Sequence, residues 1–320
     1  MRLLAVVTAF GLLVAPHVAE GQTPTAVHRV GIIHLSGHHH VVADGLRQGL
    51  RELGLEEGKN IVLDIRQTTD DLKTVEKAAR ELEQSKVDVI YTVTTPVTIA
   101  AKRATVNTPI VFSAGTDPIA LGLVESLAKP GGRLTGIHGP TRDLTAKRLQ
   151  VLKEIIPKLN RVVTFYSADE MKMVRPAREA ARQLGVQLIE RPVSSLEDLR
   201  RSLQALKPRE VDAYFHTPDI LVTSQAVSII EAARVKKLPT MFHEVSLVSK
   251  GALASYGHNY HQIGRMSAKY VQRILAGTPS RDLPVESYDK IELALNLRTA
   301  REIGLTIPSS VGVRADRLIE

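Results

Sequence analysis

The 320-residue chain contains no cysteine and no tryptophan. The lack of cysteine excludes disulfides, thiolate catalysis and thiolate metal ligands. Aromatic residues make up only 4% of the chain, so an aromatic cage for a ligand must draw on seven tyrosines and five phenylalanines. The hydrophobic content is an ordinary 43%. A chain of this length buries a large core without covalent staples, and its length predicts two domains.

Long apolar runs are also missing, except for one that extends from Leu3 to Ala15. Arg2 precedes this run, and the small residues Ala19 and Gly21 follow at the spacing of a cleavage site. The run is too short to span a membrane, so we expect a signal peptide over residues 1–21. A short N-terminal anchor is the alternative. Export without disulfides suits a bacterial periplasm.

Sequence motifs of common enzymes are absent. The chain has no G-x-G-x-x-G after a strand, no phosphate-binding loop and no G-x-S-x-G nucleophile motif. The segment that begins at His243 starts like a zinc-protease helix but has Leu247 at the position of the second histidine. The adjacent histidines 38–40 cannot easily converge on one ion. We therefore predict a protein without catalytic residues, metal or cofactor.

The chain has an excess of basic residues, with 42 Lys and Arg against 34 Asp and Glu. Removal of residues 1–21 takes away Arg2 and Glu20 and leaves the net charge at +8. Basic residues alternate with acidic ones along predicted helices, and no basic run is interleaved with aromatic residues. The pattern indicates a solvated surface and no nucleic-acid partner.

Apolar runs rich in β-branched residues alternate with segments of helical periodicity. In the first half we predict strands at 28–35, 60–66, 87–93 and 109–113, with helices at 41–54, 71–85 and 96–105. In the second half we predict strands at 160–166, 186–190 and 211–216, with helices at 175–185, 195–206 and 221–236. Such alternation predicts an α/β fold with parallel sheets.

Between the two series lies the stretch "DPIALGLVESLAKPGGRLTGI" from Asp117 to Ile137. Ile119, Leu123 and Leu127 recur at helical spacing, and the Lys-Pro-Gly-Gly segment 129–132 is a stop signal. We predict a helix followed by a short strand that carries the chain towards the second half.

The two halves share short words in the same order. Each has a strand that opens with Val-Asp, at 87–88 and at 211–212, and each places Thr-Pro just after that strand, at 95–96 and at 217–218. The matching order predicts a duplicated architecture of two α/β lobes.

Ligands of open parallel sheets bind beyond the carboxyl ends of the strands. In two such lobes these ends can face each other across a cleft. Helix starts there offer free N–H groups to an anion, and carboxylates there can pair with an ammonium group. The alternatives are that the threonines and acids only cap helices, or that Asp117, Asp219 and Glu244 form a catalytic carboxylate pair. We predict these ligand-binding residues: Ser36, His38, His39, Thr94, Thr95, Asp117, Tyr166, Ser167, Thr217, Asp219, His243, Glu244 and Tyr256.

The stretch from Asp117 resembles a signature of the ABC-transporter substrate-binding family that includes tryptophan- and tyrosine-binding members (TrpX-like). The resemblance covers nearly the whole chain after residue 21. It is carried by "RVGIIHLS", "GLRQGLRELGLEEGKNIVLDIR", "VDVIYTVTTPVTIAAKRAT", "TPIVFSAGTDP", "SYGHNYHQIGRMSAKYVQRILAGTPSRDLPVE" and "IELALNLRTAREIGLTIP".

The resemblance implies a type I periplasmic-binding fold, with two Rossmann-like lobes joined by a multi-strand hinge. We expect an N-terminal lobe over 22–137 plus about 258–285 and a C-terminal lobe over 138–257 plus about 286–320. Hinge strands are expected near 134–140, 253–257 and 285–292. The family's cleft positions map to Ser36, Thr95, Asp117, Thr217 and the loop after Tyr256.

The chain departs from the family's usual residues at three places. Arg133 stands where Asn is common, His258 stands where Pro is common, and histidines 38–40 replace a more neutral loop. Because the histidines lie near the expected cleft, the ligand of a relative does not transfer directly to this chain.

The function implied by the resemblance is an exported, monomeric component of an ABC importer that traps a small polar solute, such as an amino acid. Its other partner would be a membrane permease, bound transiently. Two alternatives stay open at this point: an exported α/β enzyme that acts on a small polar substrate, and a sensor that presents its ligand to a membrane receptor.

Overall fold

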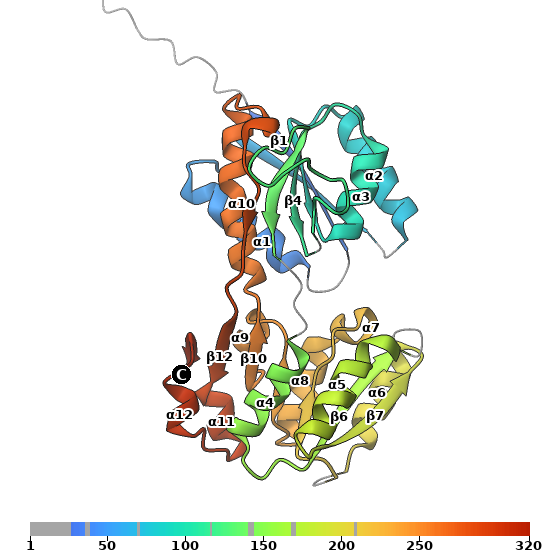
Figure 1. The fold of residues 1–320 in the computed structure, drawn as a ribbon, viewed down its shortest axis with the longest axis vertical. Coiled ribbons are helices and arrows are strands. Elements are labelled where there is room, and N and C mark those ends of the chain that lie inside the picture. Colours follow the sequence, from blue (N-terminus) through green and yellow to red (C-terminus); the bar gives the residue numbers. More distant parts are fainter. Residues whose placement is uncertain are drawn as a thin grey trace, which may run out of the picture.

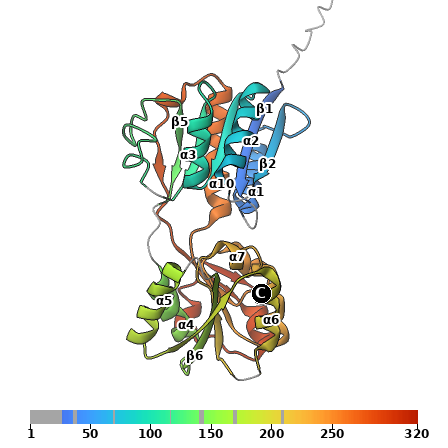
Figure 2. The same ribbon diagram turned by 90° about the vertical axis from the view of Figure 1, so that its right-hand side faces the viewer.

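The computed structural model describes residues 27–35, 39–68, 71–115, 117–139, 144–167, 171–207 and 210–320. The chain forms two α/β lobes stacked one above the other (Figures 1 and 2). Each lobe is built on its own sheet, six-stranded in the upper lobe and seven-stranded in the lower. The predicted fold class is confirmed.

The upper lobe, here called the N-lobe, has an entirely parallel sheet in the order β11-β5-β4-β3-β1-β2. Helices α1 and α10 cover one face of this sheet and α2 and α3 cover the other. The strands are β1 (His28–Leu35), β2 (Ile61–Thr68), β3 (Val89–Val93), β4 (Ile110–Ala114), β5 (Leu134–His138) and β11 (Glu286–Ser287); the helices are α1 (His40–Glu52), α2 (Leu72–Gln84), α3 (Thr95–Ala104) and α10 (Tyr260–Leu275), with a 3-10 turn η2 (Ser280–Asp282).

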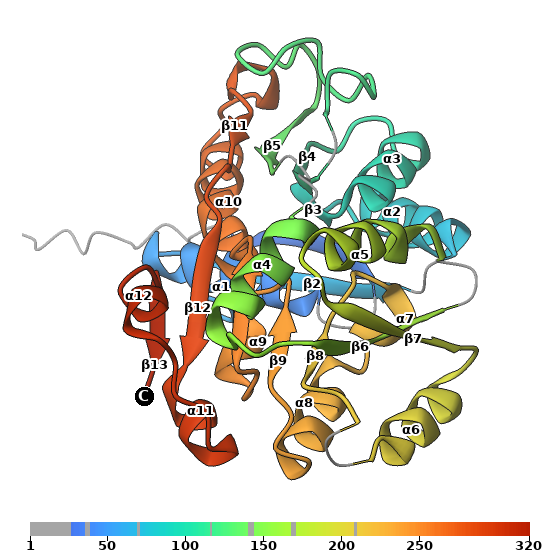
Figure 3. The ribbon, with the colours of Figure 1, turned by 60° about the horizontal axis from the view of Figure 1, so that its bottom comes forward.

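The lower lobe, the C-lobe, has the strand order β13-β12-β10-β9-β8-β6-β7 (Figure 3), parallel except for the β10–β12 pair. Its strands are β6 (Arg161–Ser167), β7 (Gln187–Val193), β8 (Ala213–Phe215), β9 (Thr240–Phe242), β10 (Ala254–Gly257), β12 (Glu292–Asn296) and β13 (Arg317–Ile319). Its helices are α4 (Thr145–Ile155), α5 (Met171–Gln183), α6 (Leu196–Ala205), α7 (Ile220–Thr223), α8 (Ala226–Val235), α9 (Ser246–Ser249), α11 (Leu297–Ile303) and α12 (Ser309–Gly312).

The same hydrogen bond to an aspartate side chain occurs at the start of one strand in each lobe. Asp88, just before β3, accepts the backbone N–H of Arg29 at 2.7 Å, and Asp212, just before β8, accepts the backbone N–H of Arg161 at 2.8 Å. Each aspartate therefore joins the start of its own strand to the start of the neighbouring first strand of the lobe. The repeated Val-Asp words correspond to equivalent positions in the two sheets.

The predicted helix from Asp117 is wrong. Residues 117–133 form turns and bends, and Gly122 has a φ of +61°, which a right-handed helix does not allow. Leu123 and Val124 are buried against the N-lobe core, and the N–H of Leu123 bonds the carbonyl of Pro118 at 2.8 Å. The apolar spacing thus anchors an irregular segment to the core. The short strand after it is confirmed as β5.

The predicted single helix at 221–236 is also wrong in detail, because it is divided into α7 and α8. The hydroxyl of Ser224 donates to the carbonyl of Leu221 at 2.7 Å, and Gln225 is the N-cap residue of the second helix, which starts at Ala226. A serine that bonds the backbone in this way competes with helix continuation.

Helices α1 and α10 approach each other closely, although more than 200 residues separate them in the chain. A Cβ added at Gly45 would lie 2.0 Å from the carbonyl oxygen of His261, and one at Gly264 would lie 1.9 Å from the carbonyl oxygen of Val42. Only glycine permits this backbone contact. It holds α10, which follows β10 of the C-lobe, on the N-lobe.

Gly45→Ala tests this contact. The carbonyl of His261 belongs to helix α10 and cannot shift without distorting that helix. We therefore expect overpacking to lower the free energy of unfolding by about 1–3 kcal/mol. This is the net loss that remains after the gain of up to about 1 kcal/mol from the higher helix propensity of alanine. Urea denaturation followed by circular dichroism measures it. Gly132→Ala is the control, because no atom lies within 4 Å of its added Cβ. Equal stability of Gly45→Ala and wild type would contradict the close contact.

Candidate functional site

The carboxyl ends of the N-lobe strands and of the C-lobe strands β6, β8, β9 and β10 point towards the other lobe (Figure 1). Nine of the predicted site residues lie at the carboxyl end of one of these strands or within four residues after it: His39, Thr94, Thr95, Asp117, Ser167, Thr217, Asp219, His243 and Glu244. Ser36 and His38 lie outside the described residues. The site therefore consists of two polar surfaces, one per lobe.

Thr94 is the most unusual residue of the N-lobe surface. It lies between β3 and α3 with φ +83° and ψ 152°, a region of backbone conformation that is almost restricted to glycine. Its Oγ1 is shielded from solvent and has no hydrogen-bond partner in the described part of the chain. A strained backbone and an unsatisfied hydroxyl are both costly, so their coincidence at a strand end makes Thr94 a candidate functional residue.

The neighbouring N-lobe residues have defined partners. Thr95 Oγ1 accepts the backbone N–H of Gly115 at 3.1 Å, which joins the ends of β3 and β4. Asp117 is exposed, and its Oδ1 accepts the N–H groups of Ile119 at 2.9 Å and Ala120 at 3.3 Å. Asp117 therefore caps a turn with Oδ1, and its Oδ2 has no hydrogen-bond partner among the described residues.

The C-lobe surface is built around Asp219, which is only 3% exposed. Its Oδ2 accepts both the N–H and the hydroxyl of Ser167 at 2.8 Å, and its Oδ1 accepts the N–H of Val222 at 2.9 Å. The hydroxyls of Thr164 and Thr217 are 3.2 Å apart. The structure thus brings Ser167, Thr217 and Asp219 together at the ends of β6 and β8.

A ladder of rings crosses the C-lobe sheet and ends at His243. The rings of His216 and His243 are stacked, with centroids 5.1 Å apart and planes at 12°, and His216 also stacks on Phe242 at 4.9 Å. His216 has Tyr214 Oη at 2.8 Å from Nδ1 and Thr223 Oγ1 at 2.9 Å from Nε2. Both ring nitrogens of the buried His216 are therefore engaged, and its ring supports that of His243.

Sequence reasoning missed His216 as a member of this site. The available signal was its position directly before Thr217, at the end of a predicted strand. Its neighbours supply no other clue, because the stack depends on β8 and β9 pairing in the sheet.

Glu244 is completely buried after β9 and accepts a hydrogen bond from the hydroxyl of Ser246. Burial, and then the negative charge of Glu244, raise the pKa of Tyr260 to about 12, while Arg148 lowers it. These three side chains therefore lie close enough for electrostatic interaction where α10 leaves the C-lobe.

The two predicted tyrosines lie in the body of the C-lobe. Tyr166 is buried and donates from its hydroxyl to Glu190 at 3.4 Å; burial, and then the charge of Glu190, raise its pKa. Tyr256 packs partly buried against the core that lies under α4 and α5. Neither contact involves the residues that surround Asp219 or His243.

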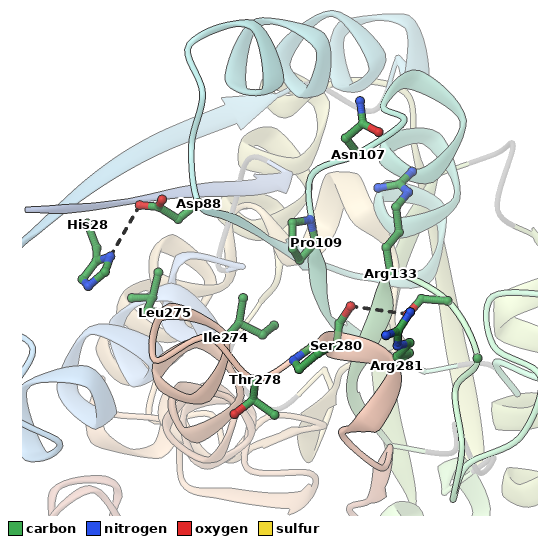
Figure 4. A pocket seen from close by; sticks show the side chains of 14 residues that line it. His28, Asp88, Asn107, Pro109, Arg133, Ile274, Leu275, Thr278, Ser280 and Arg281 are labelled. Carbon is green, nitrogen blue, oxygen red and sulfur yellow. Dashed lines mark hydrogen bonds and ion pairs between the residues drawn. The ribbon is translucent and has the colours of Figure 1, made fainter. Parts of the chain in front are cut away.

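Two surface hollows lie at the opposite ends of the sheets, beside the amino ends of the strands. The N-lobe hollow has a volume of about 520 Å³ (Figure 4) and the C-lobe hollow about 510 Å³. Asp88 in the N-lobe hollow bonds the N–H of Arg29 and is 3.7 Å from the ring of His28. Arg133 donates to the carbonyls of Lys102, Thr105 and Thr108 at 2.7–2.8 Å. Asp88 and Arg133 therefore stabilise the fold through hydrogen bonds to backbone groups.

The loop at 105–109 beside this hollow is held from the other side by Glu83. Its Oε1 accepts the N–H groups of Asn107 and Thr108 at 2.9 Å and of Val106 at 3.0 Å. Burial opposes the charged form of Glu83, but these backbone donors outweigh it and hold the pKa below 4.5.

Within the described ranges no group of three or more His, Asp or Glu side chains is placed to hold a metal ion. None of the helices in the described part of the chain is both long and apolar enough to cross a membrane.

Thr94→Gly should separate strain from binding. Glycine adopts the conformation of Thr94 freely, so we expect relief of part of a strain of about 1–3 kcal/mol and a higher melting temperature of the ligand-free protein. The same change removes the hydroxyl and should weaken binding. Thr94→Ser, the control, keeps the hydroxyl and should bind nearly as wild type. A lower melting temperature for Thr94→Gly would refute the strain.

Glu83→Gln should destabilise the protein in a pH-dependent way. The folded-state pKa of Glu83 is lowered, so its contribution to stability is complete above the unfolded value of 4.5 and is lost as the pH falls through the folded value. The difference in unfolding free energy between wild type and variant should therefore be constant well above pH 4.5 and fade as the pH falls below that value. Denaturant titrations across this range measure it. Glu197→Gln, at an exposed position, should show no comparable difference, and a pH-independent Glu83 effect would contradict the prediction.

Comparison with known proteins places the chain among solute-binding proteins. It is 29% identical over 266 residues to the tyrosine-binding protein of Clostridioides difficile (strain R20291), covering 82% of this chain and 76% of the relative. A conserved domain protein of Vibrio cholerae is 29% identical with a TM-score of 0.70, covering 92% of this chain and 99% of that one. A Streptococcus pneumoniae ABC domain in complex with L-Trp is 24% identical with a TM-score of 0.70, covering 92% and 100%, and shares the fold.

The predicted resemblance is confirmed by the model of one protein family. This model, described as ABC transporter substrate binding protein, matches residues 30–319, which include both lobes and all the segments that connect them. The chain belongs to the ABC transporter substrate-binding protein family.

Proposed function

We propose that this member of the solute-binding family traps an α-amino acid between its two lobes and delivers it to an ABC permease. The observation that carries the proposal is the pair of polar strand-end surfaces, with the strained and unsatisfied Thr94 opposite the ordered cluster around Asp219. The name of the tyrosine-binding relative supports an amino acid as the ligand.

The chemistry of the two surfaces fits a zwitterion. The start of α3 at Thr95 offers backbone N–H groups and the Thr94 hydroxyl to a carboxylate. Asp117 retains one carboxylate oxygen for an ammonium group. The flat ring of His243, supported by His216, can pack on a ligand side chain. Closure of the lobes would exclude water from these contacts and strengthen them.

The physiological setting follows from the same proposal. The protein is exported with cleavage after Gly21, works as a monomer in the periplasm and has no catalytic activity. Its lobes are bounded near 137, 258 and 285, and the segments between them bend when the ligand binds.

Native mass spectrometry of the gently purified protein, followed by thermal melts with each of the twenty amino acids, tests the function. We expect one ligand per chain and stabilisation of about 2.7 kcal/mol at a ligand concentration of 100 times the dissociation constant. The ligand should be recovered unchanged. Turnover of the ligand would favour the enzyme alternative, and no binding by any amino acid would refute the proposed ligand class.

Asp117→Asn tests the ammonium contact. The amide oxygen can still accept the N–H groups of Ile119 and Ala120, so the ligand-free protein should keep its thermal stability. Loss of the charge should weaken binding by about 10- to 100-fold, because a charge-assisted hydrogen bond contributes about 1.5–3 kcal/mol. Calorimetric titration measures the affinity of both proteins. Unchanged affinity would show that Asp117 only caps its turn.

A further inference from the structure

The lobes are connected by segments that include a compact polar cluster. Its members are His258 and Asn259, between β10 and α10, Tyr288 and Lys290, between β11 and β12, and Glu292, the first residue of β12. We refer to these five residues as the hinge cluster. Figures 1 and 2 show that the two segments run side by side between the lobes.

Asn259 makes two contacts that belong to different lobes. Its Oδ1 accepts the N–H of Gln262 at 3.0 Å and so caps the start of α10. Its Nδ2 donates to Glu292 Oε2 at 3.2 Å. One side chain therefore bonds an N-lobe helix and a C-lobe strand at the same time.

Both ends of this connection are rigid. Helix α10 is held on the N-lobe by its close contact with α1 through Gly45 and Gly264. Glu292 is the first residue of β12 and pairs with Gly257 at the end of the β10–β12 ladder. A rotation of the lobes must therefore change either the cap or the Asn259–Glu292 bond.

Glu292 is itself well fixed. It is only 5% exposed, and its Oε1 is 3.2 Å from Lys290 Nζ. The ring of His258 adds a second connection between the segments, with Nδ1 at 3.3 Å from the carbonyl oxygen of Lys290. Burial, and then the charge of Glu292, raise the pKa of Tyr288 to about 12, so this phenol is neutral at physiological pH.

We propose that Asn259 is a positioning residue that sets the angle between the lobes by tying the start of α10 to Glu292. This inference goes beyond the proposed function, on which it depends only for the reason that the lobes must move. It acts through the hinge and not through contact with the ligand.

The test measures the distance between the lobes in the ligand-free protein. Because the chain lacks cysteine, Lys77→Cys on α2 and Arg201→Cys on α6 give two unique sites for spin labels at exposed positions. Pulsed electron paramagnetic resonance then yields the distribution of distances between the labels. No ligand is required, so the result is independent of whether an amino acid binds.

Asn259→Asp keeps the helix cap, because Asp caps as well as Asn, but faces the carboxylate of Glu292 with a second carboxylate. Repulsion between the two charges should break the hydrogen bond between positions 259 and 292. The distribution of distances between the labels should then be broader than that of the wild type or shifted from it. Asn259→Ser, which also caps but lacks the amide donor, should do the same. An unchanged distribution in both variants would overturn the proposal.

A second substitution that restores the hydrogen bond distinguishes a positioning role of Asn259 from general destabilisation of the protein. Glu292→Gln alone should keep the wild-type distribution, because its amide oxygen still accepts from Asn259. The double variant Asn259→Asp with Glu292→Gln should restore that distribution, because the new amide at position 292 donates to the new carboxylate at position 259. A broad distribution in the single Glu292→Gln variant, or failure of the double variant to restore the narrow one, would overturn the proposal.

A matched control exists in the same chain. Asn296 caps α11 through the N–H of Thr299 at 2.8 Å and donates to the carbonyl of Val248 at 2.9 Å, all within the C-lobe. Asn296→Asp should lower thermal stability and leave the distance distribution unchanged. If Asn296→Asp broadened the distance distribution as much as Asn259→Asp, loss of the side-chain amide donor from any helix-capping asparagine would be enough to change the interlobe distance. That result would refute a special role for Asn259.

Discussion

The packing of α1 against α10 is the contact on which the architecture depends. Glycines at 45, 49 and 264 allow the two backbones to meet with no side chain between them. The contact returns a segment that follows the C-lobe strand β10 to the N-lobe. Since the chain must then cross again to form β12, the lobes are connected by several segments. Several parallel connections restrict relative motion to bending, where a single linker would allow free rotation.

The polar surfaces of the two lobes differ in how far their side chains are already hydrogen-bonded within the protein. On the C-lobe, Asp219, Ser167 and His216 satisfy one another, so their geometry is fixed before any ligand arrives. On the N-lobe, Thr94 stores strain and leaves its hydroxyl unsatisfied. A prepared surface keeps the entropy cost of binding low, while an unsatisfied group makes its new hydrogen bond more favourable.

Charge is used differently at the two ends of each lobe. At the amino ends of the strands, Asp88, Asp212 and Arg133 bond backbone groups and hold the sheets and loops together. At the carboxyl ends of the same sheets, the described residues that follow β1, β3, β4, β8 and β9 are mainly Thr, His and acids, while Lys290 follows β11 and the buried Arg148 interacts with Tyr260.

The sequence by itself did not predict α4 or α10, but it determined the α/β class, the strands and helices between residues 28 and 113, most of those between 160 and 236, the export expectation and the family. These follow from local periodicity and word order, which the chain carries without reference to distant residues. It could not determine the course of residues 117–133, because apolar residues at helical spacing can equally anchor turns to a core, and Gly122 decided the outcome through its φ of +61°. It also missed His216 and the hinge cluster. The stack on His243 and the bond from Asn259 to Glu292 join residues 27 and 33 positions apart, respectively. Only the pairing of strands β8 with β9 and β10 with β12 brings these side chains together.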